Sequence, residues 1–296
     1  MSETLENLKH KMDTADQLYS VVRTMKALAA SNIGQYENAV QSLEDYYRTI
    51  ELGLVACFRH FKKNFFSEKE NTTDENGTGI VIFGSDQGLV GQFNSILLDF
   101  MSKKINDLPG KKFVWVIGER VHSELENSNL SPVNLYTAPA SVKTITSLVE
   151  NILLSVETYR TKGKISQVFV FYNKPVSKVA YEPFGQQLLP VNKVWEFELA
   201  QIEWTTKNLP EVIGNEEKTV VALIHEYLFV SLYKACAESL ASENASRLAA
   251  MQRAEKNINE LLDDLTHSYH QLRQSSIDEE LFDVVSGFEA LKKKSE

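Results

Sequence analysis

The sequence predicts an α/β protein in which a long antiparallel coiled coil, made from the two ends of the chain, carries a central Rossmann-like α/β domain. Three observations lead to this fold class. Apolar residues recur every three or four positions along both ends of the chain. All seven prolines lie between Pro109 and Pro210, so none interrupts either end. In the middle, short β-branched runs alternate with helical patterns, which is typical of a largely parallel sheet.

The first segment, residues 1–63, is expected to form one helix of the coiled coil. Between Glu3 and Phe61 the apolar stripe is nearly continuous, and only Gly34 and Gly53 lie inside it, each costing about 1 kcal/mol relative to alanine. A helix of this length would reach roughly 90 Å, which is wider than one globular core. The stripe comprises Leu5, Leu8, Met12, Ala15, Tyr19, Val22, Met25, Ala29, Ile33, Tyr36, Val40, Leu43, Tyr47, Ile50, Leu54, Cys57 and Phe61.

A solvated linker, residues 64–78, is expected to join this helix to an α/β domain over residues 79–210. The linker is rich in Ser, Thr, Asn, Asp and Glu, which is typical of loops. Within the domain, apolar and β-branched runs predict strands and amphipathic runs predict helices. The expected strands are 79–83, 112–118, 166–173 and one around 179–191, and the expected helices are 93–105 and 141–159.

The last segment, residues 211–296, is expected to be the second helix of the coiled coil. Neither glycine nor proline occurs between Gly214 and Gly287, and apolar positions continue as far as Phe288. So long a pattern is typical of a coiled coil or a membrane span. Three polar or charged residues interrupt its most apolar run, 220–237, which is also shorter than the roughly 20 residues a bilayer crossing needs. We therefore expect no direct insertion into a bilayer.

Composition excludes several classes of function. The 296-residue chain has a net charge of −9, so no basic excess is present to bind nucleic acid. Its charged start, MSETLENLKHKM, resembles neither a secretory signal nor a transit peptide. Cys57 and Cys236 lie in apolar helical patterns and are interpreted as small buried side chains in a reducing compartment.

The loop GSDQGLVGQFN, residues 84–94, raises the question of a phosphate site, because it joins a predicted strand to a predicted helix. Its glycines follow the spacing GxxxGxxG rather than GxGxxG, and Gly91 is followed by Gln92 and Phe93 rather than by the lysine and hydroxyl residue of a P-loop. Three interpretations stay open from the residues alone: a tight strand-to-helix connection, a loop that contacts a partner protein, and a nucleotide site.

No other pattern points to an active site. His267 and His270 share a helix face, but no HExxH or similar ligand set surrounds them. GxSxG, CxxC and serine–lysine motifs are absent. The acidic pairs at 263–264 and 279–280 are interpreted as solvated charge. The sequence therefore predicts no catalytic residue, no cofactor and no metal site.

Three parts of the chain resemble one family, the gamma (central rotor shaft) subunit of F-type ATP synthases. The segment VVRTMKALAAS, residues 21–31, is similar to the family's ITKAMKMVAAS, and the loop at 84–94 is similar to its SDRGLCGGFN. Near the C-terminus, ASENASRLAAMQRAEKN (241–257), LDDLTHSYHQLRQSSIDEEL (262–281) and VVSGFEAL (284–291) match the family's ending almost position by position.

This resemblance implies a non-catalytic shaft that couples ion flow to the catalytic cycle. The implied partners are three alpha and three beta subunits of the catalytic head, the epsilon subunit and the membrane ring of c subunits. The implied location is peripheral, on the cytoplasmic face of the cell membrane. In this family the glycine loop binds no nucleotide and lies near the base of the coiled coil. The alternative that the residues leave open is a coiled-coil scaffold protein that displays an α/β domain.

The resemblance also implies the residues that contact partner subunits. They fall in the three matching segments, and the Arg-Gln pair near the C-terminus would face a loop of a catalytic subunit, where a planar guanidinium suits a carboxylate. For the two basic residues of the first segment, solvated helix charge is the alternative. The expected contact residues are Arg23, Met25, Lys26, Asp86, Gln87, Gly88, Gly91, Asn94, Arg273 and Gln274.

The chain also departs from the family pattern. In the glycine loop Gln87 replaces an arginine, Val90 a cysteine and Gln92 a glycine, and NIGQYENAV (32–40) replaces a basic run. Asp278 stands where a threonine is usual. These changes remove positive charge from surfaces expected to face acidic parts of the catalytic subunits. They suggest a specialised or alternative rotary ATPase, with a sodium-linked machine as one alternative.

Overall fold

The computed structural model describes residues 4–61, 77–106, 108, 110–126, 130, 132–177, 180–190, 202, 204, 208 and 210–293. Most of the expected linker, 64–76, lies outside the described residues. The division of the chain at 1–63, 64–78, 79–210 and 211–296 stays a prediction. The first strand begins at Gly77, two residues before the expected start of the α/β domain.

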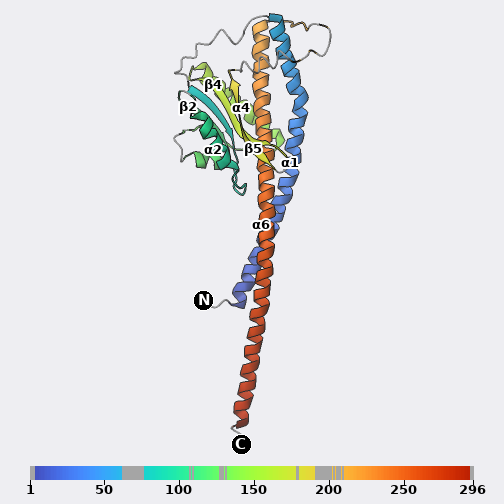
Figure 1. The fold of residues 1–296 in the computed structure, drawn as a ribbon, viewed down its shortest axis with the longest axis vertical. Helices are drawn as coiled ribbons and strands as arrows, with labels where there is room; N and C mark the ends of the chain where they lie inside the picture. The colour runs from blue at the N-terminus through green and yellow to red at the C-terminus, as the bar shows by residue number, and fades with distance from the viewer. Residues whose placement is uncertain are drawn as a thin grey trace. The chain divides into compact units, whose positions relative to one another are not determined.

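Two long helices begin and end the described chain (Figure 1). Helix α1 spans Leu5–Phe61 and helix α6 spans Glu216–Lys293, which confirms one uninterrupted helix at each end. The chain divides into two compact units, one made of Met1–Leu28 with Leu248–Glu296 and the other of Ala29–Arg247. Each unit is described by itself below.

The larger unit contains a five-stranded sheet with the strand order β3-β2-β1-β4-β5. Strands β1 to β4 run parallel and β5 is antiparallel to β4, so the expectation of a largely parallel sheet is confirmed. The strands are β1 (Gly77–Phe83), β2 (Lys112–Ile117), β3 (Pro132–Tyr136), β4 (Ile165–Pro175) and β5 (Tyr181–Leu189), and the helices between them are α2 (Phe93–Ile105), α3 (Glu119–Leu125) and α4 (Val142–Thr161).

Helices cover both faces of this sheet, and the alternation along β1 divides the core into two clusters. Val81 and Phe83 lie in one cluster with side chains of α1, α4 and α6. Ile80 and Ile82 lie in the other, with side chains of α2 and α3. All seven residues of β1 are buried, as expected for the central strand of a parallel sheet. The sheet is therefore built directly onto the long helices of its own unit.

Within residues 29–247 the two long helices run antiparallel. The side chain of Asn32 donates to that of Asn244 over 3.4 Å, and the hydroxyl of Tyr46 donates to the Glu226 carboxylate over 2.7 Å. Further along α1, a Cβ added at Gly53 would lie 3.1 Å from a methyl group of Leu223. Because the position on α6 falls as the position on α1 rises, the antiparallel pairing expected from the sequence is confirmed in this unit.

The apolar run 220–237 lies within the core of this larger unit. Leu228, Val230 and Leu232 are all buried there. Among the described residues one helix, Glu217–Gly287, is long and apolar enough to cross a membrane by length and composition alone. A core helix of a globular domain passes the same test, and the burial of this run is the behaviour expected of such a helix.

Candidate functional site

The glycine loop lies at the carboxyl end of the central strand β1 and leads into α2. From β1 the chain first builds β2 and β3 on one side of the sheet, then crosses over to β4 on the other side. The loop therefore stands where the direction of winding reverses, which is where open α/β sheets usually bind ligands. Its side chains decide whether such a ligand could bind here.

The carboxylate of Asp86 accepts two backbone hydrogen bonds that tie the loop to its neighbours. One comes from the N–H of Glu119 at the start of α3, over 3.0 Å, and the other from the N–H of Ala138 after β3, over 2.9 Å. Free N–H groups at such a position could hold a phosphate. Here the chain's own carboxylate occupies these two N–H groups, so neither is free to hold a phosphate.

Ser85 and Asn94 close the base of the loop through a reciprocal pair of hydrogen bonds. The N–H of Ser85 donates to Asn94 Oδ1 over 3.1 Å, and Asn94 Nδ2 donates back to Ser85 Oγ over 2.9 Å. Both side chains are buried. Asn94, which the resemblance suggests as a partner contact, is therefore used inside the fold, and any direct role in binding a partner stays a proposal.

Two glycines of the loop differ in how closely other atoms surround them. A Cβ added at Gly84 would lie 2.4 Å from Cγ1 of Val121, so only glycine allows α3 to pack this closely. A Cβ added at Gly88 would meet nothing within 4 Å. Gly84 is thus required by packing, whereas nothing among the described residues requires Gly88.

Helix α6 covers the same loop through two buried serines. The hydroxyl of Ser239 donates to the carbonyl oxygen of Phe83 over 3.0 Å, and that of Ser246 donates to the carbonyl oxygen of Val90 over 2.6 Å. From the sheet, the side chain of Asn173 on β4 donates to the carbonyl oxygen of Phe93 over 2.9 Å. The point at which an α/β ligand would bind is therefore bonded to a helix, which favours a structural connection over a nucleotide site.

A buried ion pair lies on the same stretch of α6. Arg247 Nη2 donates to Glu243 Oε1 over 2.6 Å, and the two side chains are only 13% and 8% exposed. Burial raises the pKa of Glu243, while the charge of Arg247 acts in the opposite direction. This ion pair was not predicted from the sequence, although a Glu and an Arg four residues apart are the signal of a helical ion pair.

The remaining candidate residues of the loop lie at its surface. Gln87, Gly88 and Gly91 are exposed, and Leu89 between them is 61% exposed with a positive φ of 62°. No expectation from the sequence included Leu89. An apolar side chain held out at a loop tip is available to a partner, and here the structure places it beside the predicted contact residues.

In the smaller unit the three candidate residues of α1 have different surroundings. Arg23 is exposed and Met25 is half-buried. Lys26 is also half-buried and forms an ion pair with Glu255 of α6. Lys26, which is not part of the expected apolar stripe, is therefore paired inside the unit.

A second apolar stripe, which was not predicted from the sequence, lies on the same part of α1. Leu18, Val21 and Leu28 are 53%, 56% and 59% exposed, and with Met25 they recur at intervals of three and four. Residues at this spacing share one helix face. An exposed apolar face beside the expected contact residues marks a surface that a partner could cover.

Arg273 and Gln274 are exposed near the end of α6. Beyond them, every side chain that the structure describes from Ile277 to Gly287 is exposed. The large apolar side chains of this stretch, which continue the expected stripe, are 49–73% exposed and are Ile277, Leu281, Phe282, Val284 and Val285. The unit to which they belong does not bury this apolar surface.

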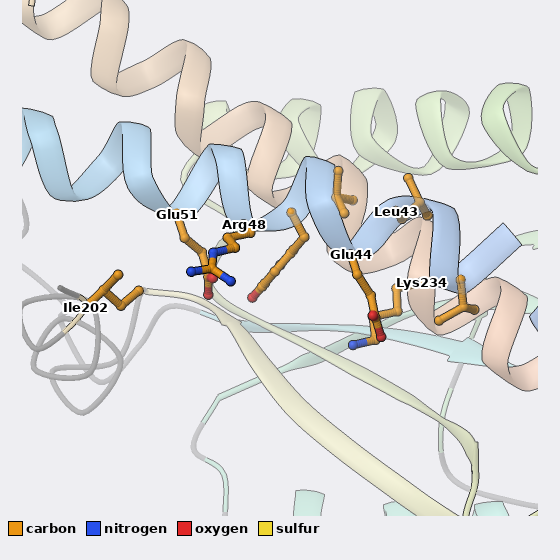
Figure 2. Close-up of a pocket in the computed structure, with 9 residues that line it drawn as sticks. Leu43, Glu44, Arg48, Glu51, Ile202 and Lys234 are labelled. Carbon is orange, nitrogen blue, oxygen red and sulfur yellow. The ribbon is translucent and has the colours of Figure 1, made fainter. Parts of the chain in front are cut away.

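The larger unit also holds a cavity of about 360 Å³ between α1 and α6. Figure 2 shows Glu44, Arg48 and Glu51 extending from α1, with Lys234 on α6 and Ile202 across the space. Its two basic side chains are matched by two acidic ones, so the lining has no charge bias towards a phosphate. The described residues also contain no group of three or more His, Cys, Asp or Glu side chains suited to a metal ion.

Comparison with known proteins identifies the family. The sequence model of the ATP synthase family, which describes the gamma subunit, matches residues 4–291. The chain belongs to the ATP synthase gamma-subunit family. Members of this family are non-catalytic stalk subunits.

Three solved structures with a similar fold come from mitochondrial ATP synthases. A chain of the Tetrahymena thermophila mitochondrial ATP synthase central stalk and c-ring is 21% identical, with a TM-score of 0.55 over 79% of this chain and 99% of that one. Two structures from Euglena gracilis mitochondrial ATP synthase are 13% identical with TM-scores of 0.62. The first is a rotor structure, and the match covers 92% of this chain and 98% of the matched chain. The second is an OSCP, F1 and c-ring structure, and the match covers 99% of this chain and 96% of the matched chain.

These comparisons confirm the fold class predicted from the sequence, two terminal helices with an α/β domain between them. They also confirm the family to which the sequence was assigned. For a gamma-family chain, the glycine loop is then the point at which the α/β domain is bonded to the shaft helix α6.

Proposed function

We propose that this gamma-family chain is the rotating central shaft of an ATP synthase, seated on a ring of c subunits and surrounded by three alpha and three beta subunits. The observation that carries the proposal is the family match over residues 4–291. Two features of the structure support it. The chain supplies two long antiparallel helices, and the end of α6 leaves apolar side chains exposed that a surrounding assembly could cover.

Asymmetry explains how a chain without an active site could drive chemistry elsewhere. One shaft inside a ring of three catalytic sites presents a different face to each site. Each face makes different contacts, and a ligand shifts a conformational equilibrium only through such differences. When ion flow turns the shaft, every site would pass through nucleotide binding, synthesis and release in turn. The shaft's own requirement is stiffness, which two packed helices supply.

The α/β domain must turn together with the shaft in this account. The hydrogen bonds from Ser239 and Ser246 to the carbonyl oxygens at the end of β1 and in the glycine loop would hold the two together. We infer that the exposed loop tip, with Gln87, Gly88 and Leu89, faces the surrounding subunits. The shared core of the sheet and the long helices would then transmit torque from the domain.

The finer assignments rest on the family resemblance and are proposals. We place the complex at the cytoplasmic face of the cell membrane, with the epsilon subunit beside the α/β domain. The coupled ion is a proton or a sodium ion, and the loss of positive charge at Gln87 points to a variant machine. The proposed contacts with the alpha and beta subunits are made by Arg23, Met25, Lys26, Asp86, Gln87, Gly88, Gly91, Asn94, Arg273 and Gln274.

Purification through a tag on this chain from native membranes tests the proposal. Native mass and ATPase activity of the eluate are measured together. The shaft proposal predicts a complex with three copies each of two larger subunits, one copy of this chain, and ATPase activity. Arg273→Ala is expected to lower that activity without dissociating the complex, because Arg273 is exposed and outside the core. A chain that elutes alone would instead favour the scaffold function.

A further inference from the structure

Strand β3 forms one edge of the sheet, and no strand lies beyond it in the part of the chain that the structure describes. An edge strand presents unpaired backbone N–H and C=O groups, and charged residues commonly keep other strands away from it. Pro132 begins β3, but none of the five residues, PVNLY, is charged. The opposite edge strand, β5, carries the exposed Glu182. The edge at β3 therefore lacks a charge that would keep another strand from pairing with it.

The backbone groups of Leu135 point away from the rest of the sheet. The N–H of Gly118 donates to the carbonyl oxygen of Tyr136 over 2.9 Å, so Tyr136 directs its backbone groups towards β2. Along a strand this direction alternates from one residue to the next. The N–H and C=O of Leu135 therefore face the open side. Two residues further on, the backbone of Thr137 forms no hydrogen bond among the described residues.

A groove lies beside this edge, between the end of β3 and helix α4. Its volume is about 440 Å³, and it is lined by residues 135–140 and by the α4 side chains of Thr144, Ser147, Leu148 and Asn151. None of these lining residues is charged. Leu135, which is 44% exposed, adds an apolar surface, and α4 adds hydroxyl and amide groups. The lining therefore offers no cation to a phosphate and suits uncharged side chains.

We propose that β3 and this groove bind an extended, uncharged segment of a partner polypeptide, which adds a sixth strand to the sheet. Main-chain hydrogen bonds to Leu135 would align the segment, and its alternate side chains would enter the groove. A segment that matches the five residues of β3 would be about 17 Å long. A phosphate or a helix could not pair with the backbone groups of the edge in this way. The inference goes beyond the shaft proposal, because it assigns a binding mode to a sheet edge outside the predicted contact residues.

Site-specific photo-crosslinking in the complex purified through a tag on this chain tests the inference. The probe is p-benzoylphenylalanine in place of Asn134, which is exposed on β3 and does not line the groove. The crosslinked peptide is identified by mass spectrometry. The expected product joins position 134 to a different polypeptide, within an uncharged run of about five residues.

Variants of Leu135 test the backbone pairing. Leu135→Pro removes the outward N–H and takes no hydrogen bond from the pairing with β2, which is why edge strands tolerate proline. It is expected to lower the crosslink yield about tenfold, because an acceptor on the added strand loses its donor. Leu135→Ala keeps the N–H and should lower the yield less. The unfolding midpoints of the two variants show whether the sheet stays intact.

A second pair of variants tests the neutral lining. Ser147→Glu places a charge in the groove and is expected to lower the crosslink yield about tenfold, because an uncharged segment would bury that charge without a partner. Thr146→Glu places the same charge on the next residue of α4, outside the groove, and should leave the yield unchanged. Both residues are exposed, so neither variant should unfold the domain.

Several outcomes would overturn the inference. They are an unchanged yield in Leu135→Pro or in Ser147→Glu, no crosslink in the complex, a crosslink to a second copy of this chain, and a crosslink to a charged segment. Failure of the shaft proposal would look different, because the added strand would still be crosslinked in a complex that lacks the ATPase subunits.

Discussion

The hydroxyl of Ser246 on helix α6 donates a hydrogen bond of 2.6 Å to the carbonyl oxygen of Val90 in the glycine loop, and both residues are buried. This bond joins a loop at residue 90 to a helix more than a hundred and fifty residues later in the chain. It makes the strand-to-helix connection part of the shaft assembly. We therefore interpret the loop as a structural connection between the α/β domain and α6. Each of the contacts that hold it in place can be tested by substitution.

Ser246→Ala should destabilise the chain by about 1 kcal/mol, because the buried carbonyl of Val90 loses its donor. The measurement is the midpoint of urea unfolding at unchanged slope. Ser95→Ala is the matched control, since Ser95 is exposed and its hydroxyl donates to the nearby carbonyl oxygen of Gln92. Equal midpoints for the two variants would mean that the bond to the loop contributes nothing.

Asp86→Ala should cost about 2 kcal/mol, because the N–H groups of Glu119 and Ala138 would both lose their acceptor. Gln87→Ala, at the exposed neighbouring position, should change stability by less than about 0.5 kcal/mol. Unfolding free energies of the two variants provide the comparison. A stable Asp86→Ala chain would show that its carboxylate serves the surface rather than the fold.

Gly84→Ala should be strongly destabilising, by about 2 kcal/mol or more, because the new Cβ would lie 2.4 Å from Val121. Gly88→Ala places its Cβ in open space and should leave the unfolding temperature nearly unchanged. If Gly88 contacts a partner, its variant should instead weaken assembly of the complex. Comparable unfolding temperatures for the two variants would contradict the close packing of α3 on the loop.

Arg247→Met should cost about 3–5 kcal/mol, because it leaves the buried Glu243 carboxylate without its cation. Burial raises the folded-state pKa of Glu243, and this variant should raise it further. A raised pKa in the folded state favours the protonated carboxyl. Stability is therefore fully present below the unfolded-state pKa and is lost as pH rises through the folded-state value.

The free energy of unfolding, measured from acid to neutral pH, checks whether stability falls as the pH rises. The Arg247→Met chain should lose more stability than the wild type as the pH rises, and the double variant Glu243→Leu with Arg247→Met should recover most of the loss, since apolar replacements of buried pairs are often neutral. A single variant whose stability increased with pH would refute the account of this pair.

The sequence predicted the elements with strong local signals and missed those whose signals are short. Helix α2 was predicted at its observed bounds because an amphipathic pattern begins directly after the glycine loop. Strand β3 and helix α3 were missed. The strand has five residues, two of them exposed, and the helix has seven, so both are shorter than the window of roughly 11–18 residues over which a helical period is recognised.

At the candidate site, contacts between residues distant in the sequence could not be predicted from local patterns. Asp86 bonds to residues 33 and 52 positions later in the chain, and no spacing in the sequence reveals such partners. The missing lysine and the glycine spacing did indicate that the loop lacks a P-loop's phosphate ligands.

Direct observation of rotation tests the central claim, that this chain turns inside an ATP synthase. Lys162→Cys provides an exposed attachment point for a bead, and the two natural cysteines are buried with raised pKa values, so they should not react. With the catalytic head fixed to a surface and ATP supplied, the account predicts rotation in one direction with three pauses in each turn. A bead that stays still while the same complex hydrolyses ATP would contradict it.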